Sequence, residues 1–87
     1  MQKSMVKVKL FANFREVAGV KELEICAETV EDVLNELIKR FPRLKELFKR
    51  HNYVHIMVNG DIIKDTKFRL KNNDIIAIFP PVSGGYQ

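Results

Sequence analysis

The segment of this sequence best suited to chemistry lies near its end, where an apolar run gives way to prolines and glycines. Residues 74–79 are followed by segment 80–85, Pro-Pro-Val-Ser-Gly-Gly. The prolines cannot donate to a β-ladder and they fix φ, so they end the strand and hold the next residues extended. At about 3.1 Å per residue, Gly85 would lie roughly 18 Å beyond Phe79. Because only glycines let a backbone pass through a narrow channel, the sequence predicts a tail that enters another protein's active site.

Other residues that commonly do chemistry are few and isolated. Cys26 is the only cysteine, and a lone Cys after an Ile is usually small core filler rather than a nucleophile. His51 and His55 are four residues apart, but the second falls in a predicted strand, which argues against a helical metal pair. No carboxylate pair has an apolar setting, and no Gly-rich loop joins a strand to a helix. The sequence therefore predicts no metal site and no conventional catalytic centre.

The first half of the chain predicts a hairpin of strands. Residues 5–11 and 20–25 alternate between apolar and charged side chains, which is typical of half-buried strands. Residues 12–19 are predicted to be a connection, with Gly19 free to take a positive φ. Phe11 falls on the lysine-bearing face of its strand, so we expect its ring near the surface.

An amphipathic helix is predicted next, with Thr29 as its N-cap and acidic residues in its first turn. Its apolar stripe consists of Val30, Val33, Leu34, Leu37, Ile38 and Phe41. Pro42 predicts that the helix ends at Phe41, and residues 44–48 predict a further short helical turn.

The second half of the chain predicts the remaining strands. Residues 53–58 alternate, and Asn59-Gly60 is a strong signal for a type I′ hairpin turn leading into residues 61–63. Residues 72–74 predict a turn, and residues 74–79 predict a buried strand that pairs on both sides. We expect the apolar first and last strands to be parallel central neighbours. The fold class is therefore α+β, a β-grasp (ubiquitin-like) roll in which one main helix packs across a mixed sheet.

Composition indicates a small globular protein. The 87 residues leave room for one domain, predicted over residues 5–85 with a flexible tail from residue 80. We find neither a secretory leader nor a run long enough to cross a bilayer, so we expect a cytoplasmic protein that binds no membrane. The formal charge of +4 is too mild to imply nucleic acid. The basic run between Lys39 and Arg50 predicts a solvated helical face, with an acidic partner or RNA as alternatives.

Three segments of the sequence resemble the small subunit of molybdopterin synthase, the MoaD family. They are Val-Lys-Leu-Phe-Ala at 8–12 with Arg15-Glu16 and Gly19, Val-Asn-Gly at 58–60, and above all Phe-Pro-Pro-Val-Ser-Gly-Gly at 79–85. The resemblance extends over nearly the whole chain, and the last heptad is its specific part. The related sulfur carrier of thiamin synthesis, ThiS, shares the fold and the Gly-Gly but lacks the Phe-Ala…Arg-Glu start.

The resemblance implies that Gly85 is the working group. A partner related to ubiquitin-activating enzymes would adenylate its carboxylate with ATP, and a sulfur donor would convert it to a thiocarboxylate. The large subunit would then place the sulfur on a pterin precursor, in assembly of a molybdenum or tungsten cofactor. The chain would bind no cofactor and would not be an enzyme alone. Gly84 would give clearance, and the partner contacts would be Phe11, Ile62, Phe79, Pro80, Pro81 and Val82.

One departure from the family is Tyr86-Gln87, which follows the Gly-Gly pair. A thiocarboxylate cannot form on Gly85 while that residue is amide-bonded to Tyr86. Either a protease trims the two residues, or they are an artefact, or this copy does not carry sulfur; we favour trimming.

Two other functions stay open on the sequence. The chain could be a ubiquitin-like modifier, attached to lysines or serving tRNA thiolation through the same activated glycine. It could also be a passive β-grasp binding module with an inert tail.

Overall fold

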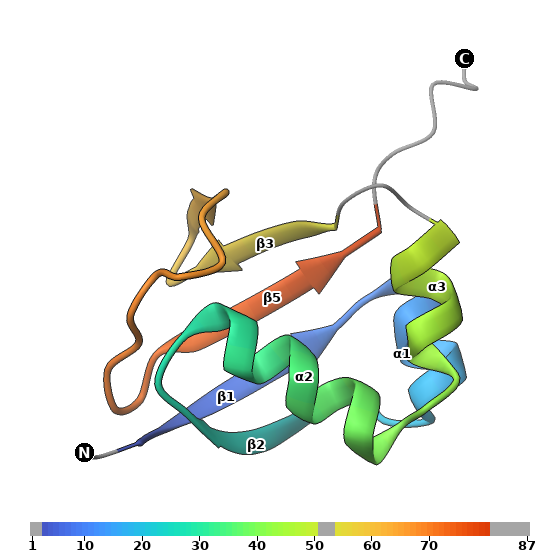
Figure 1. Ribbon diagram of the computed structural model, residues 1–87, viewed down its shortest axis with the longest axis horizontal. Coiled ribbons are helices and arrows are strands. Elements are labelled where there is room, and N and C mark those ends of the chain that lie inside the picture. The colour runs from blue at the N-terminus through green and yellow to red at the C-terminus, as the bar shows by residue number, and fades with distance from the viewer. Residues whose placement is uncertain (1–2, 51–53, 81–87) are drawn as a thin grey trace.

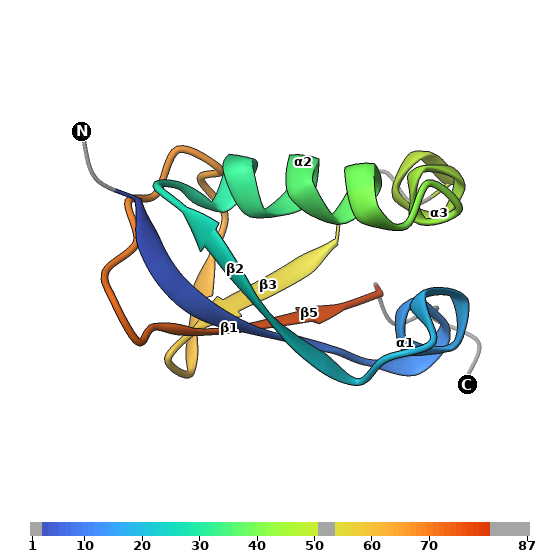
Figure 2. The same cartoon turned by 90° about the horizontal axis from the view of Figure 1, so that it is seen from below.

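The computed structural model describes residues 3–50 and 54–80, which form one mixed sheet with helices. The elements are β1 (Ser4–Leu10), α1 (Ala12–Ala18), β2 (Glu22–Ala27), α2 (Val30–Arg40), α3 (Leu44–Arg50), β3 (His55–Val58), β4 (Asp61–Ile63) and β5 (Ile75–Phe79). The strand order is β2-β1-β5-β3-β4. β1 and β5 are parallel central neighbours and the other pairs are antiparallel. The predicted fold class is confirmed, and α2 lies across one face of the sheet (Figure 1; Figure 2).

The core lies between the sheet and α2. Val6, Val8 and Leu10 of β1 are at most 1% exposed, as the alternation of that strand predicts. From the helix and the last strand, the fully buried side chains are Val30, Val33, Leu37, Ile76 and Ile78. Each contributes about 1.5–3 kcal/mol of hydrophobic free energy before entropy is counted. We call the opposite side of the sheet the outer face.

The start of α2 is fixed by reciprocal hydrogen bonds between Thr29 and Asp32. The Thr29 hydroxyl accepts from the Asp32 N–H at 3.2 Å, and the Asp32 carboxylate accepts from the Thr29 N–H at 3.3 Å. This capping box satisfies two backbone donors that a helix start leaves unpaired. The helix runs to Arg40 with Phe41 as its C-cap, so both predicted boundaries are confirmed.

Residues 12–18 form a helix, α1, so the predicted connection over residues 12–19 is wrong. The helix has seven residues, too few for a clear apolar period and too few for stability in isolation. Its stability comes from packing. Phe14 is fully buried, and its ring packs edge-on against the ring of Phe48 in α3, with the ring centroids 5.3 Å apart. Gly19 ends the helix at a φ of 81°, the positive φ expected of it.

Two predictions of burial are also wrong. Cys26 is exposed rather than core filler, because it alternates with the buried Ile25 and so lies on the outer face. Ile75 in β5 is 43% exposed, because the helices cover only one face of the strand that was expected to be buried. The Asn59-Gly60 turn is confirmed, with φ values of 52° and 89°.

Candidate functional site

The end of β5 carries a pair of stacked aromatic rings on the outer face. Leu10 pairs with Ile78 in the parallel register of β1 and β5, so the residues that follow them, Phe11 and Phe79, come side by side. Their ring centroids are 4.5 Å apart and their planes differ by 7°. Both rings are only partly buried. An aromatic surface therefore lies where segment 80–85 leaves the sheet.

The stacked rings form part of an apolar hollow of about 460 Å³. The hollow is lined by Phe11, Ala12, His55, Met57, Ile62, Phe79 and Pro80. The predicted site residues Phe11, Ile62, Phe79 and Pro80 are thus brought together, and Ile62 is 64% exposed. Their role in binding a partner stays a prediction. The other predicted site residues, Pro81, Val82, Gly84 and Gly85, lie outside the described residues, as do Tyr86 and Gln87.

The sequence did not identify His55, Met57 and Ala12 as lining residues. Alternation in β3 does predict that His55 and Met57 point to the outer face, but only strand pairing shows what lies next to them. His55 pairs with Phe79, and Met57 pairs with Ala77 on one side and Ile62 on the other. The hollow thus extends across four strands, from the end of β1 to β4.

A hydrogen-bond network holds the β3–β4 hairpin, and with it Ile62, against the start of β5. Asp74 is 9% exposed, and its carboxylate accepts from the Asn59 amide at 2.9 Å and from the Lys71 N–H at 2.8 Å. The Asn59 side chain in turn accepts from the Ile75 N–H at 2.9 Å. Because hydrogen bonds of a buried charged acceptor are stronger than neutral ones, this network fixes the position of the hairpin.

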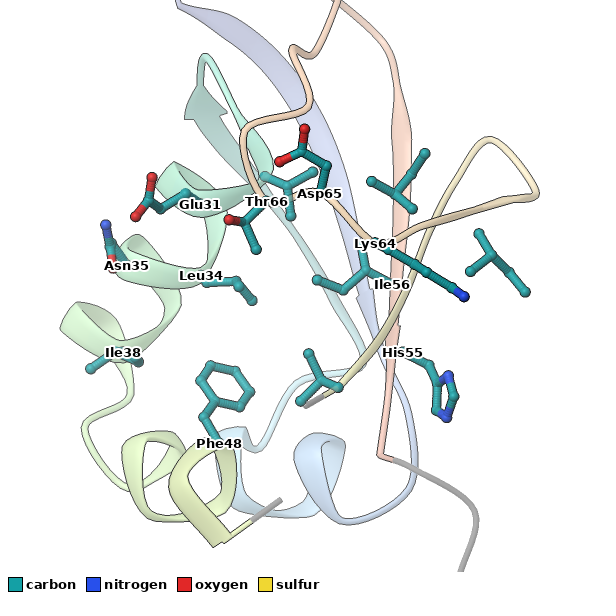
Figure 3. A pocket seen from close by; sticks show the side chains of 14 residues that line it. Glu31, Leu34, Asn35, Ile38, Phe48, His55, Ile56, Lys64, Asp65 and Thr66 are labelled. Atoms are coloured by element: carbon teal, nitrogen blue, oxygen red, sulfur yellow. The ribbon is translucent and has the colours of Figure 1, made fainter. Parts of the chain in front are cut away.

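A larger hollow of about 760 Å³ lies between α2 and the segment that follows β4 (Figure 3). Figure 3 shows Leu34, Phe48 and Thr66 facing into it, whereas His55 points away. Glu31 on its rim pairs with Lys67 at 2.8 Å, and that hydrogen bond raises the pKa of Lys67. Of the predicted site residues that the structure describes, only Ile62 lines this hollow. We therefore take the apolar hollow beside Phe79 as the candidate site, because the tail follows directly from it.

The described residues show an apolar surface and no cluster of metal-ligating side chains. Over residues 3–50 and 54–80, no three His, Cys, Asp or Glu side chains come close enough together to hold a metal ion. In the same residues no helix is both long enough and apolar enough to span a membrane. A shallow apolar surface that includes aromatic residues is typical of a protein-binding site.

Comparisons with known proteins agree with the fold described above. A model of the ThiS family matches residues 8–85. The molybdopterin synthase sulfur carrier subunit of Arabidopsis thaliana is 35% identical, over 92% of this chain and 82% of its own length. The small archaeal modifier protein 1 of Methanosarcina acetivorans superposes with a TM-score of 0.84 at 38% identity, covering 98% of this chain and all of its own. A chain from the complex of subunits 1 and 2 of the Helicobacter pylori molybdopterin-converting factor superposes with a TM-score of 0.67 at 28% identity. The match covers 93% of this chain and 99% of the Helicobacter pylori chain.

Proposed function

Because the chain belongs to the ThiS family, we propose that it is a ubiquitin-like sulfur carrier, the small subunit of molybdopterin synthase. The observation that carries the proposal is the position of the apolar hollow, which adjoins Phe79 and Pro80 at the base of the Gly-Gly tail. A docking surface at that place lets a partner hold the folded domain while its active site takes the glycine end. The similarity to the Arabidopsis thaliana sulfur carrier subunit supports the same role.

In this function the carboxylate of Gly85 is the group that reacts. It attacks the α-phosphate of ATP in a ubiquitin-activating-type partner, and pyrophosphate leaves as the acyl adenylate forms. A sulfur donor then displaces AMP, so that one carboxylate oxygen is replaced by sulfur. A free carboxylate is a poor acyl donor, and adenylation supplies the leaving group. The chain itself holds no cofactor in this scheme. The partner uses ATP, and a cytoplasmic location is consistent with that supply.

The partner that receives the thiocarboxylate is the large subunit of molybdopterin synthase. The Helicobacter pylori chain that superposes on this one comes from a complex of two subunits. We propose that the apolar hollow, with Pro81 and Val82 of the tail, contacts the large subunit. The prolines direct the tail and Gly84 lets it pass into the active site.

Activation requires that the bond between Gly85 and Tyr86 first be hydrolysed, because an amide carbonyl offers no carboxylate to ATP. We propose a peptidase that cleaves after Gly-Gly. Such a step consumes water and leaves the carboxylate on Gly85 and a free amine on Tyr86.

A second candidate function is that of a protein modifier. The similarity to the small archaeal modifier protein 1 favours it, since that protein matches this chain over nearly its full length. The activated Gly85 would then be attacked by a lysine amine rather than by a sulfur donor, and an isopeptide bond would form.

The intact mass of the protein isolated from its own cells tests these functions. A mass that ends at Gly85, with one oxygen replaced by sulfur, is the expected result. Adducts on lysines of other proteins that disappear in Gly85→Ala would instead favour the modifier. If every molecule retained Tyr86, the glycine would have no carboxylate, and the chain would be a passive binding module.

A further inference from the structure

Positive charge is unevenly distributed along this chain. Residues 39–50 hold six of the 15 Lys and Arg side chains but only one of the 11 acidic ones, Glu46. Their formal net charge is therefore +5, against +4 for the whole chain. The remaining residues together have a formal net charge of −1. Four of these basic residues have a described and exposed position, namely Lys39, Arg40, Arg43 and Lys45, and we call them the basic surface.

Most of this charge is not neutralised by neighbouring side chains. Arg40 pairs with Glu36 at 2.9 Å, whereas Lys39, Arg43 and Lys45 belong to none of the ion pairs found among the described residues. The hydrogen bond from Arg40 lowers the pKa of Glu36, and the charges of Lys39 and Lys3 act in the same direction. A carboxylate in this region is therefore surrounded by positive charge that exceeds its own.

Helix stability accounts for only part of the basic surface. Lys39 and Arg40 are in the last turn of α2, where the helix dipole favours positive charge. Arg43 lies between the helices, and Lys45 is in the first turn of α3, where the dipole disfavours a cation. The fold gains nothing evident from the charges of Arg43 and Lys45.

The basic surface lies on the helix side of the molecule, at the end of α2 and the start of α3, and α3 runs from it toward the end of β5 (Figure 1). Both views show α3 and α1 close to the last residues of β5 (Figure 1; Figure 2). Contacts link the two regions: Phe48 of α3 packs on Phe14 of α1, and α1 follows directly from Phe11, which stacks on Phe79. Segment 80–85 spans at most about 20 Å, so a protein that encloses Gly85 must approach this end of the molecule closely.

We infer that the basic surface faces an acidic surface on the protein that receives the tail. The inference rests on the proposed function and adds the electrostatic character of the partner. The apolar hollow on the outer face makes the close contact, and the basic surface on the helix side attracts the partner at longer range and so speeds association. Nucleic acid is the weaker candidate, because the aromatic residues of this segment, Phe41 and Phe48, pack against the core instead of offering a stacking surface.

The test measures association of the full-length chain with the molybdopterin synthase large subunit of the same organism, at low and high salt. The basic variant is R43E/K45E. Its control is R69E/K71E, which makes the same charge change at exposed positions before the opposite end of β5. We expect the basic variant to associate about tenfold more slowly at low salt, with the difference shrinking as salt rises, and the control to stay within about twofold of wild type. Circular dichroism checks that both variants fold.

Three results would overturn the inference. The first is an equal slowing in both variants, which would reflect net charge alone, and the second is no slowing in either. The third is salt-dependent binding of a labelled single-stranded RNA that R43E/K45E loses and R69E/K71E keeps. Phe79→Ala separates this inference from the proposed function: if that variant weakens the complex and R43E/K45E does not, only the inference fails. If the wild-type chain does not bind the large subunit at all, the proposed function fails and the inference with it.

Discussion

The rings of Phe11 and Phe79 stack 4.5 Å apart across the two central strands, although 67 positions separate them in the sequence. The contact follows from the parallel pairing of Leu10 with Ile78. Phe79 is the last residue of β5, so the stack lies next in sequence to the segment that is proposed to react. We therefore expect the stack to act both in stability and in docking, and each role can be measured.

Phe79→Ala should raise the Kd for the large subunit at least tenfold, because it removes one of the two aromatic rings that line the apolar hollow. A double-mutant cycle with Phe11→Ala should show a coupling of about 0.5–1.5 kcal/mol in the free energy of unfolding. Titration calorimetry and urea denaturation measure the two quantities. An affinity within twofold of wild type would contradict the docking role of the hollow.

Ile62→Glu should abolish most of the affinity for the large subunit while leaving the fold intact. Ile62 is 64% exposed, so we expect the free energy of unfolding to change by less than about 0.5 kcal/mol. Ile75 is the matched control, an exposed Ile on the same outer face that pairs with Lys7 at the other end of β5. Equal losses of affinity for Ile62→Glu and Ile75→Glu would show that the contact is not confined to the hollow.

Asp74→Ala should destabilise the protein by about 2 kcal/mol or more, because the Asn59 amide and the Lys71 N–H lose a charged acceptor. Asp61→Ala in the neighbouring hairpin is the control. Asp61 is exposed, and we expect a change below about 0.5 kcal/mol. Urea denaturation measures both, and a similar small loss in the two variants would refute the importance of the Asp74 network.

The pair of Glu36 and Arg40 should make stability depend on pH in the acidic range. Arg40 lowers the pKa of Glu36 from its ordinary 4.5, so folding favours the ionised carboxylate. The stabilisation is therefore present above pH 4.5 and is lost as pH falls through the lowered pKa. The difference in unfolding free energy between wild type and Glu36→Gln should shrink over that range, and Arg40→Gln should show the same trend. A difference that stays constant with pH would contradict the assignment.

The sequence predicted most of the fold because its periodic patterns report local physics. Alternation in residues 5–11 identified the inward side chains of β1, and the helical spacing after Thr29 identified the buried face of α2. The Asn59-Gly60 pair predicted a turn that needs positive φ twice. The sequence did not predict α1, because seven residues carry too little periodic signal and the helix depends on Phe14 packing against Phe48.

Part of the candidate site also followed from the sequence. Alternation places Phe11 on the outer face of β1, and the exposed Ile62 follows the predicted turn. The sequence could not show that His55 and Met57 complete the hollow. Both are in β3, and the other residues that line the hollow come from other parts of the chain. The Asp74 network was missed for the same reason, since Asn59 and Asp74 are 15 residues apart and a turn signal at each says nothing about their contact.

The sequence by itself therefore determined which side chains face the core and where the main helix begins and ends. Its prediction of a thin Gly-Gly tail after the last strand falls outside the described residues. Only the tertiary structure decided which exposed apolar residues meet and that α3 runs from the basic surface toward the end of β5. The reason is that burial patterns and turn signals act between residues a few positions apart. The register of β1 with β5, and of β5 with β3, is instead set when all strands pack on α2 together.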